Sequence, residues 1–191
     1  MIAGHFGFAA AVKARVPRVP LWALMLATVW LDVLFVPLVL GGVETFAAVP
    51  GTRGGYGDAL IHADYTHSLL GAIVLSVAFG GVATIPWGHR VGAVLGGVVF
   101  SHWLLDLPMH RHDMPLLPAN TGDLPLLGFG LWRVPSASAL LELALVAGGT
   151  WLYWRSARAA AGAENASRAD VAAASMLGCG LLTLVLNVAG F

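Results

Sequence analysis

The sequence predicts an all-α, polytopic membrane protein, a single domain of about five transmembrane helices in a compact bundle with an internal polar site. Of its 191 residues, 58% are hydrophobic and only 10% are charged, and its mean hydropathy is +0.81. Soluble domains carry about 25% charged residues, so this composition cannot cover a water-facing surface. Several runs of about 20 apolar residues, each long enough for one helical crossing, supply the second observation. The third is that acidic residues interrupt some of these runs.

The apolar runs follow one another along the whole chain. The first is broken only by Asp32, the third is short, and the fourth carries Glu142. We expect membrane spans at residues 20–40, 66–86, 91–107, 136–154 and 171–189. No small-residue cleavage site follows the first run, so we expect it to be retained rather than removed as a signal peptide.

Three segments outside the spans also carry expectations. The apolar stretch 1–12 is too short to cross a bilayer, which favours an interfacial or half-inserted helix. Residues 41–65 are glycine-rich and are expected to form an irregular outer loop. The second long outer loop, 107–135, is both apolar and rich in proline. Such a loop is typical of a cover over a site and, equally, of a packed connector.

Basic residues set the expected orientation, because they concentrate in cytoplasmic loops. With a cytoplasmic N-terminus, most of the ten Lys and Arg residues fall inside: Lys13, Arg15, Arg18, Arg90, Arg155, Arg158 and Arg168. The others fall outside: Arg53, Arg111 and Arg133. We therefore expect a multi-pass protein with its N-terminus in the cytoplasm and its C-terminus outside, with the lipid bilayer as its partner. Ten basic and ten acidic residues leave no polybasic patch, which argues against a nucleic-acid partner. The pattern indicates no oligomeric state.

Ionisable residues inside the spans point to function, because charge in a membrane is costly. A rise of about 1.5 Å per helical residue puts Asp32, His102 and Asp106 near the middle or in the outer half of a core roughly 30 Å thick. The polar residues expected in this layer come from several helices: Asp32, His67, His102, Asp106, Glu142 and Asn187. Their common depth predicts a shared internal site.

The residue types at this depth suit a metal ion. His102 and Asp106 are four residues apart, so they share one helix face and can ligate one cation. Imidazole with carboxylate is a suitable ligand set for zinc, and also for manganese or iron. A hydrogen-bonded helix pair and a proton relay remain open as alternatives. Cys179 is the only cysteine, which excludes a zinc site built on cysteine pairs. Three polar residues of the following loop have positions more typical of solvated side chains than of ligands: His110, His112 and Asp113.

Four motifs in order support a family resemblance. They are Gly4-His5, the span acid Asp32, HADYTHSLL at 62–70 and SHWLLD at 101–106. This order resembles the YdjM-like family of inner-membrane metal-dependent hydrolases, which is distantly similar to zinc-dependent phospholipase C. The resemblance covers roughly residues 1–118. It implies four core metal ligands in this chain, Asp32, His67, His102 and Asp106. It also implies two further ligands, His62 and His5.

The chain departs from the family pattern at two places. No second acid and histidine follow Asp32 in WLDVLF. Ala63 and Asp64 stand where an arginine and a glycine are common in the family. The second departure removes an obvious phosphate-binding group.

The resemblance implies a metal-dependent hydrolase acting at the outer leaflet on a phosphoester in a lipid or lipid-linked substrate, with zinc as the first choice of divalent metal. His62, Asp64 and Glu142 are the candidates for its general base. Two other functions use the same groups. A small proton-coupled transporter or permease would use the buried acids and histidines as a relay, although the sequence shows no inverted repeat. A haem-binding membrane protein would use His67 and His102 as axial ligands.

Overall fold

The computed structural model describes residues 1–51 and 57–189, which form a mostly helical protein. Arg53, counted above among the outer charges, lies outside these residues. The helices are α1 (Ile2–Arg15), α2 (Leu21–Thr28), α3 (Trp30–Leu40), α4 (Leu69–Asp106) and α5 (Pro135–Ala189). Two short 3-10 turns, η1 (Pro118–Asn120) and η2 (Leu131–Arg133), lie between α4 and α5. The helical class predicted from composition is confirmed.

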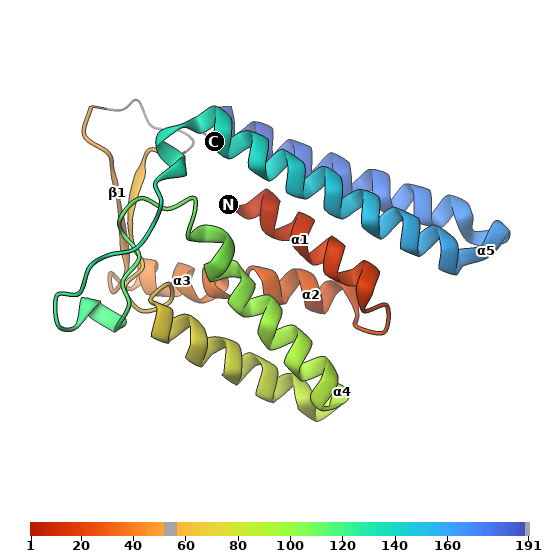
Figure 1. Cartoon of the computed structure of the whole chain (residues 1–191), viewed down its shortest axis with the longest axis horizontal. Helices are drawn as coiled ribbons and strands as arrows, with labels where there is room; N and C mark the ends of the chain where they lie inside the picture. The colour runs from red at the N-terminus through yellow and green to blue at the C-terminus, as the bar shows by residue number, and fades with distance from the viewer. Residues whose placement is uncertain (52–56, 190–191) are drawn as a thin grey trace.

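Each of the two long helices contains a sharp reversal at one glycine. Gly88 in α4 has φ 78° and ψ 166°, and Gly162 in α5 has φ 66° and ψ −178°. Glycine adopts this positive φ at no steric cost. The two arms of each helix therefore run antiparallel (Figure 1). In α4 the arms pack closely, since a Cβ added to Gly80 would come within 2.8 Å of the carbonyl oxygen of Gly92. The stretch between the fourth and fifth predicted spans is helical on both sides of Gly162.

The first predicted span is divided in two. Helices α2 and α3 meet at Val29 with a bend of 49°. Within the described part of the chain, α4 and α5 are long and apolar enough to cross a membrane, and the bent α2–α3 pair is a third candidate. These helices are consistent with association with a membrane.

Helix α1 packs inside the bundle along the first arm of α5. Its buried positions are mostly small residues, and a Cβ added to Gly149 would overlap the backbone of Gly7. Further along, the carbonyl of Ala14 accepts a hydrogen bond from the hydroxyl of Ser156 at 3.2 Å. The segment expected to be interfacial or half-inserted is thus one of the helices of the bundle core, and its first turn lies beside the last turn of α4 (Figure 1).

Loops and a short β-ribbon cover one end of the bundle. Strands β1 (Thr45–Ala48) and β2 (Ala59–His62) pair antiparallel within the loop that was expected to be irregular. The chain between α4 and α5 folds back over the start of α4, where the N–H groups of Leu69 and Leu70 donate to the carbonyls of Pro115 and Leu116. The described parts of the two loops, residues 41–51, 57–65 and 107–135, therefore form a cap that is held by backbone hydrogen bonds.

Candidate metal centre

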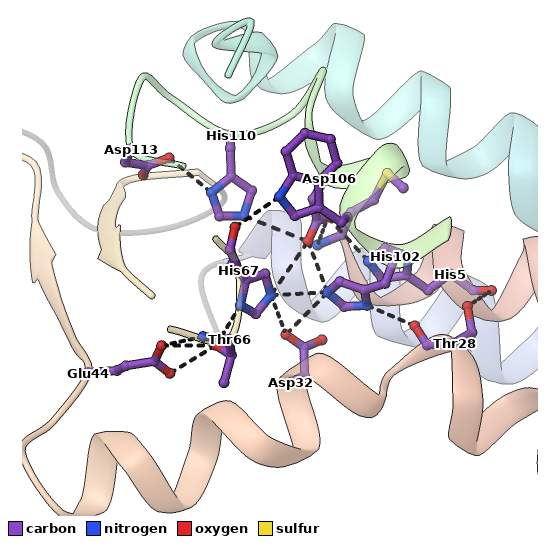
Figure 2. A network of polar contacts seen from close by, with 12 residues as sticks. His5, Thr28, Asp32, Glu44, Thr66, His67, His102, Asp106, His110 and Asp113 are labelled. Atoms are coloured by element: carbon purple, nitrogen blue, oxygen red, sulfur yellow. Dashed lines mark hydrogen bonds and ion pairs between the residues drawn. The ribbon is translucent and has the colours of Figure 1, made fainter. Parts of the chain in front are cut away.

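Five ionisable side chains converge at the capped end of the bundle (Figure 2). His5 comes from α1, Asp32 from α3, His67 from the turn before α4, and His102 and Asp106 from the last turns of α4. His5 and His102 are completely buried, and His67 and Asp106 are nearly so. The Asp32 side chain is the most exposed of the five, at 35%. The sequence placed all five among the expected metal ligands.

The carboxylate of Asp106 lies at the middle of this group. Its Oδ2 is 3.0 Å from His102 Nε2 and 3.9 Å from His67 Nε2, and its Oδ1 is 3.2 Å from His5 Nε2. Oδ1 of Asp32 lies 3.5 Å from His67 Nε2 and 3.6 Å from His102 Nε2. Two ligand atoms at about 2.0–2.1 Å from a tetrahedral zinc ion are about 3.3 Å apart. The distances between ligand atoms in the cluster, 3.0 to 3.9 Å, lie on both sides of this 3.3 Å separation.

Glu44 controls the orientation of His67 through Thr66. Glu44 is buried, and its Oε1 accepts hydrogen bonds from the backbone N–H groups of Tyr65 and Thr66, both at 2.8 Å. The hydroxyl of Thr66 is 2.9 Å from Oε2 of Glu44 and 2.9 Å from Nδ1 of His67. A carboxylate can only accept, so the hydroxyl donates to Glu44 and its oxygen accepts from the Nδ1–H of His67. The lone pair of His67 is therefore on Nε2.

The same reasoning fixes His102. Its Nδ1 lies 2.8 Å from the carbonyl oxygen of Thr28, which sits at the break between α2 and α3 and can only accept. In the neutral ring the lone pair of His102 is then also on Nε2, and the Nε2 atoms of His67 and His102 are 3.2 Å apart. Two lone pairs that face each other at this distance repel unless a metal ion or a proton lies between them. Histidines that bind a metal through Nε2 usually donate their Nδ1–H to a neighbouring carbonyl, carboxylate or water.

His5 and Asp106 carry buried atoms that need a partner. Among the described residues, Nδ1 of His5 has no hydrogen-bond partner, and the 3.2 Å contact between its Nε2 and Oδ1 of Asp106 does not form a hydrogen bond. The His5 ring stacks on His102, with ring centroids 3.9 Å apart. Buried polar atoms without partners are costly, so these atoms fit a cation that would satisfy them.

Two overlapping groups offer three ligand atoms close enough for one ion. They are His5, His102 and Asp106, and Asp32, His67 and His102. Because Nδ1 of His102 is engaged by Thr28, both groups depend on the same Nε2 atom. They therefore describe one centre rather than two independent sites.

The candidates for a general base lie outside the cluster. His62 is exposed at the end of β2. Ala59 and Ile61 line the cavity described below, so the alternation of strand side chains turns His62 to the opposite face. Asp64 is half-buried in the following turn, where its backbone carbonyl accepts from the N–H of Ala119 at 3.0 Å.

Glu142 has a different place in the structure. It is completely buried on α5, and its Oε2 accepts a hydrogen bond from the backbone N–H of Gly4 at 3.0 Å. The first N–H groups of a helix have no partner within that helix, so a carboxylate there stabilises it. Glu142 therefore fastens the first turn of α1, and with it His5, beside the cluster.

Three residues near the centre differ from what the sequence indicated. His110 and Asp113 were expected to be solvated, which is wrong, since they are only 3% and 7% exposed. His112, between them, is exposed as expected. Glu44 was not among the candidates because it lies 22 residues before Thr66, with no periodicity to connect them. The adjacency of Thr66 to His67 is the only local sign of this interaction.

A cavity of about 480 Å³ opens beside the cluster. Three side chains of the centre, Asp32, His67 and Asp106, lie on its wall together with the neighbouring His110. Other parts of the wall are apolar, including Phe35, Ile61 and Trp132, and Asn187 of α5 adds an amide. The volume falls in the range of about 300–1,000 Å³ that is typical of small-molecule sites.

Comparisons with family models, curated proteins and solved structures found no match to this chain. The chemistry of the centre is therefore inferred from its own side chains. A buried set of imidazole and carboxylate groups could hold a divalent cation at the wall of a cavity large enough for a substrate group.

We expect Glu44→Gln to weaken metal binding about 10- to 100-fold, the usual effect of losing a group that orients a ligand. The amide keeps only one accepting oxygen for the donors of Tyr65 and Thr66, so the tautomer of His67 is less strictly fixed. Competition with a chromophoric chelator measures the affinity. Glu164→Gln, at an exposed position of α5, is the control. Equal affinity of the two variants would show that Glu44 does not position His67.

Proposed function

We propose that the protein is a membrane-embedded metal-dependent hydrolase that acts on a phosphoester in a lipid or lipid-linked substrate. The observation that supports this best is the pair of inward-facing Nε2 atoms of His67 and His102, 3.2 Å apart, beside two carboxylates at a cavity wall. Oxygen and nitrogen donors favour zinc, with manganese or iron as alternatives.

Each residue of the centre has a distinct task in this proposal. Asp32, His67, His102 and Asp106 would hold the cation, with His5 as a further ligand on the Oδ1 side of Asp106. A bound divalent metal polarises a phosphoryl oxygen and lowers the pKa of water. The amide of Asn187 can donate a hydrogen bond to a substrate oxygen. The described residues that line the cavity do not include His62, Asp64 or Glu142, so we assign no proton transfer to these three side chains.

The membrane arrangement is part of the same proposal. The α2–α3 pair and the four arms of α4 and α5 would make five crossings. The contact of Ala14 with Ser156 places Lys13 and Arg15 at the same end of the bundle as Arg155. By the distribution of basic residues this end would face the cytoplasm of an inner (plasma) membrane, and the metal centre would lie toward the outer leaflet. Residue 1 would then lie within the membrane, since its nitrogen is 3.7 Å from the carboxylate of Asp106.

The rim of the cavity favours a lipid-like substrate. Ile2 and Val36 line the cavity, yet they are 43% and 55% exposed. In a bilayer such apolar side chains would contact lipid, so the cavity would open to the acyl chains as well as to the capped end. A phosphate group at the centre and an acyl chain at this rim would both be accommodated.

A proton relay is the second candidate, since the pairing of His102 Nε2 with Asp106 Oδ2 at 3.0 Å also suits an imidazolium. Haem binding is less compatible with the geometry. Axial nitrogens at about 2.0 Å from a metal are about 4 Å apart with the porphyrin between them. The Nε2 atoms of His67 and His102 are closer than this.

The proposal is tested by the metal content of protein purified in mild detergent without chelator. We expect stoichiometric zinc, manganese or iron in the unmodified protein and in His89→Ala, whose histidine is exposed at the α4 reversal, and no metal in His102→Ala. The metal-loaded protein should then hydrolyse a chromogenic phosphodiester or a phospholipid in mixed micelles. A protein that stays metal-free after incubation with these ions would overturn the proposal, and proton flux in proteoliposomes would then favour the relay.

A further inference from the structure

A further histidine faces the centre from the loop after α4. Nε2 of His110 lies 3.7 Å from Oδ2 of Asp106, and its ring centroid is 6.1 Å from that of His67. The backbone N–H of His110 donates to the carbonyl of Asp106 at 2.8 Å, so helical spacing continues for one more turn. Side chains four residues apart share a face, which is why His110 points at the same carboxylate as His102.

Asp113 holds the ring of His110 in this direction. Its Oδ1 is 3.0 Å from Nδ1 of His110, and its Oδ2 accepts a hydrogen bond from the backbone N–H of Ile61 at 3.2 Å. Because the carboxylate accepts, Nδ1 of His110 carries the hydrogen and the lone pair is on Nε2. The same arrangement of Nδ1 held from outside and Nε2 turned inward was found at His67 and His102 (Figure 2).

The Oδ2 atom of Asp106 is consequently surrounded by imidazoles. The Nε2 atoms of His102, His110 and His67 lie 3.0, 3.7 and 3.9 Å from it. A purely structural role for His110 would be packing on Trp132, whose ring centroid is 4.4 Å away. Packing alone does not explain why a buried lone pair faces a buried carboxylate at a distance too long for a hydrogen bond.

We propose that His110 is a further metal ligand and that Asp113 is the residue that positions it. This inference rests on the proposed metal centre and adds a further imidazole on its cavity side. Together with Asp32, His67, His102 and Asp106 it would give three nitrogen donors and two carboxylate donors, which are ligand types that zinc takes. His110 and Asp113 also couple the cap to the centre, since Asp113 binds strand β2 through Ile61.

The test compares His110→Ala and Asp113→Asn with His112→Ala, an exposed histidine of the same loop. Zinc affinity is measured by chelator competition, and the visible spectrum of the Co²⁺-substituted protein reports the ligand field. We expect His110→Ala to lose at least about 100-fold in affinity and to change the Co²⁺ bands, and Asp113→Asn to lose about 10-fold. His112→Ala should match the unmodified protein in both measurements.

The outcomes separate this inference from the proposed function. If the unmodified protein binds metal and His110→Ala binds it with the same affinity and spectrum, only the role of His110 is overturned. If the unmodified protein binds no metal, the proposed function fails as well. Should His110→Ala not elute as a folded protein, X-ray absorption of the zinc-loaded unmodified protein decides the matter, because imidazoles give a distinct scattering signature. Because His5, His67 and His102 already supply up to three imidazoles, more than three imidazoles per zinc would support the inference, and three or fewer would overturn it.

Discussion

Asp106→Asn is expected to abolish stable metal binding and, with it, hydrolytic turnover. The two oxygens of Asp106 contact different histidines of the centre, Oδ1 facing His5 and Oδ2 facing His102. The amide has nearly the same volume but no negative charge, and its nitrogen is a donor rather than a ligand. Removing a group that merely orients a ligand costs about 10- to 100-fold in affinity, so we expect the loss of this carboxylate to exceed 100-fold.

Elemental analysis and chelator competition on the purified protein measure this loss directly. Glu164→Gln is the matched control, because it also removes one negative charge but lies at an exposed position of α5. Gel filtration and circular dichroism show whether the variant is folded. Normal metal content in folded Asp106→Asn would contradict the assignment of this carboxylate to the centre, and turnover without metal would contradict metal-dependent hydrolysis.

Gly149→Leu is expected to separate α1 from α5 and to lower stability and metal affinity together. A Cβ at this position would overlap the backbone of Gly7, which cannot rotate away as a side chain can. Overpacking of a well-packed interior typically costs about 1–3 kcal/mol, and we expect the upper part of that range or more because backbone meets backbone. Metal affinity falls as well, because α1 carries His5 into the cluster.

Gly148→Leu provides a neighbouring control. A Cβ added to Gly148 meets no described heavy atom within 4 Å. The free energy of unfolding of Gly148→Leu should therefore stay within about 0.5 kcal/mol of that of the unmodified protein. Thermal unfolding in detergent and zinc competition are measured on both variants. A similar melting temperature for Gly149→Leu and Gly148→Leu would show that the α1–α5 contact is not the close one described here.

The sequence by itself predicted the parts of the protein that depend on local pattern. The apolar runs at 66–86, 91–107, 136–154 and 171–189 predicted helical arms in series, because apolar length is a local property. The structure added that the chain reverses at Gly88 and Gly162. The spacing of His102 and Asp106 predicted a shared helix face, and the two side chains are 3.0 Å apart. The depth of Asp32 and His67 along their spans predicted that they would lie in the same layer.

Tertiary structure decided which other residues reach that layer. The contact of Glu44 with Thr66 and that of Asp113 with Ile61 join segments 22 and 52 residues apart, so no periodic pattern could reveal them. The burial of His110 depends on a loop whose backbone hydrogen bonds are made to other segments rather than within itself. His5 enters the centre only because α1 packs on α5 through Gly7 and Gly149. Helix periodicity fixes which side chains share a face, whereas the packing of distant segments determines which of those faces meet around one point.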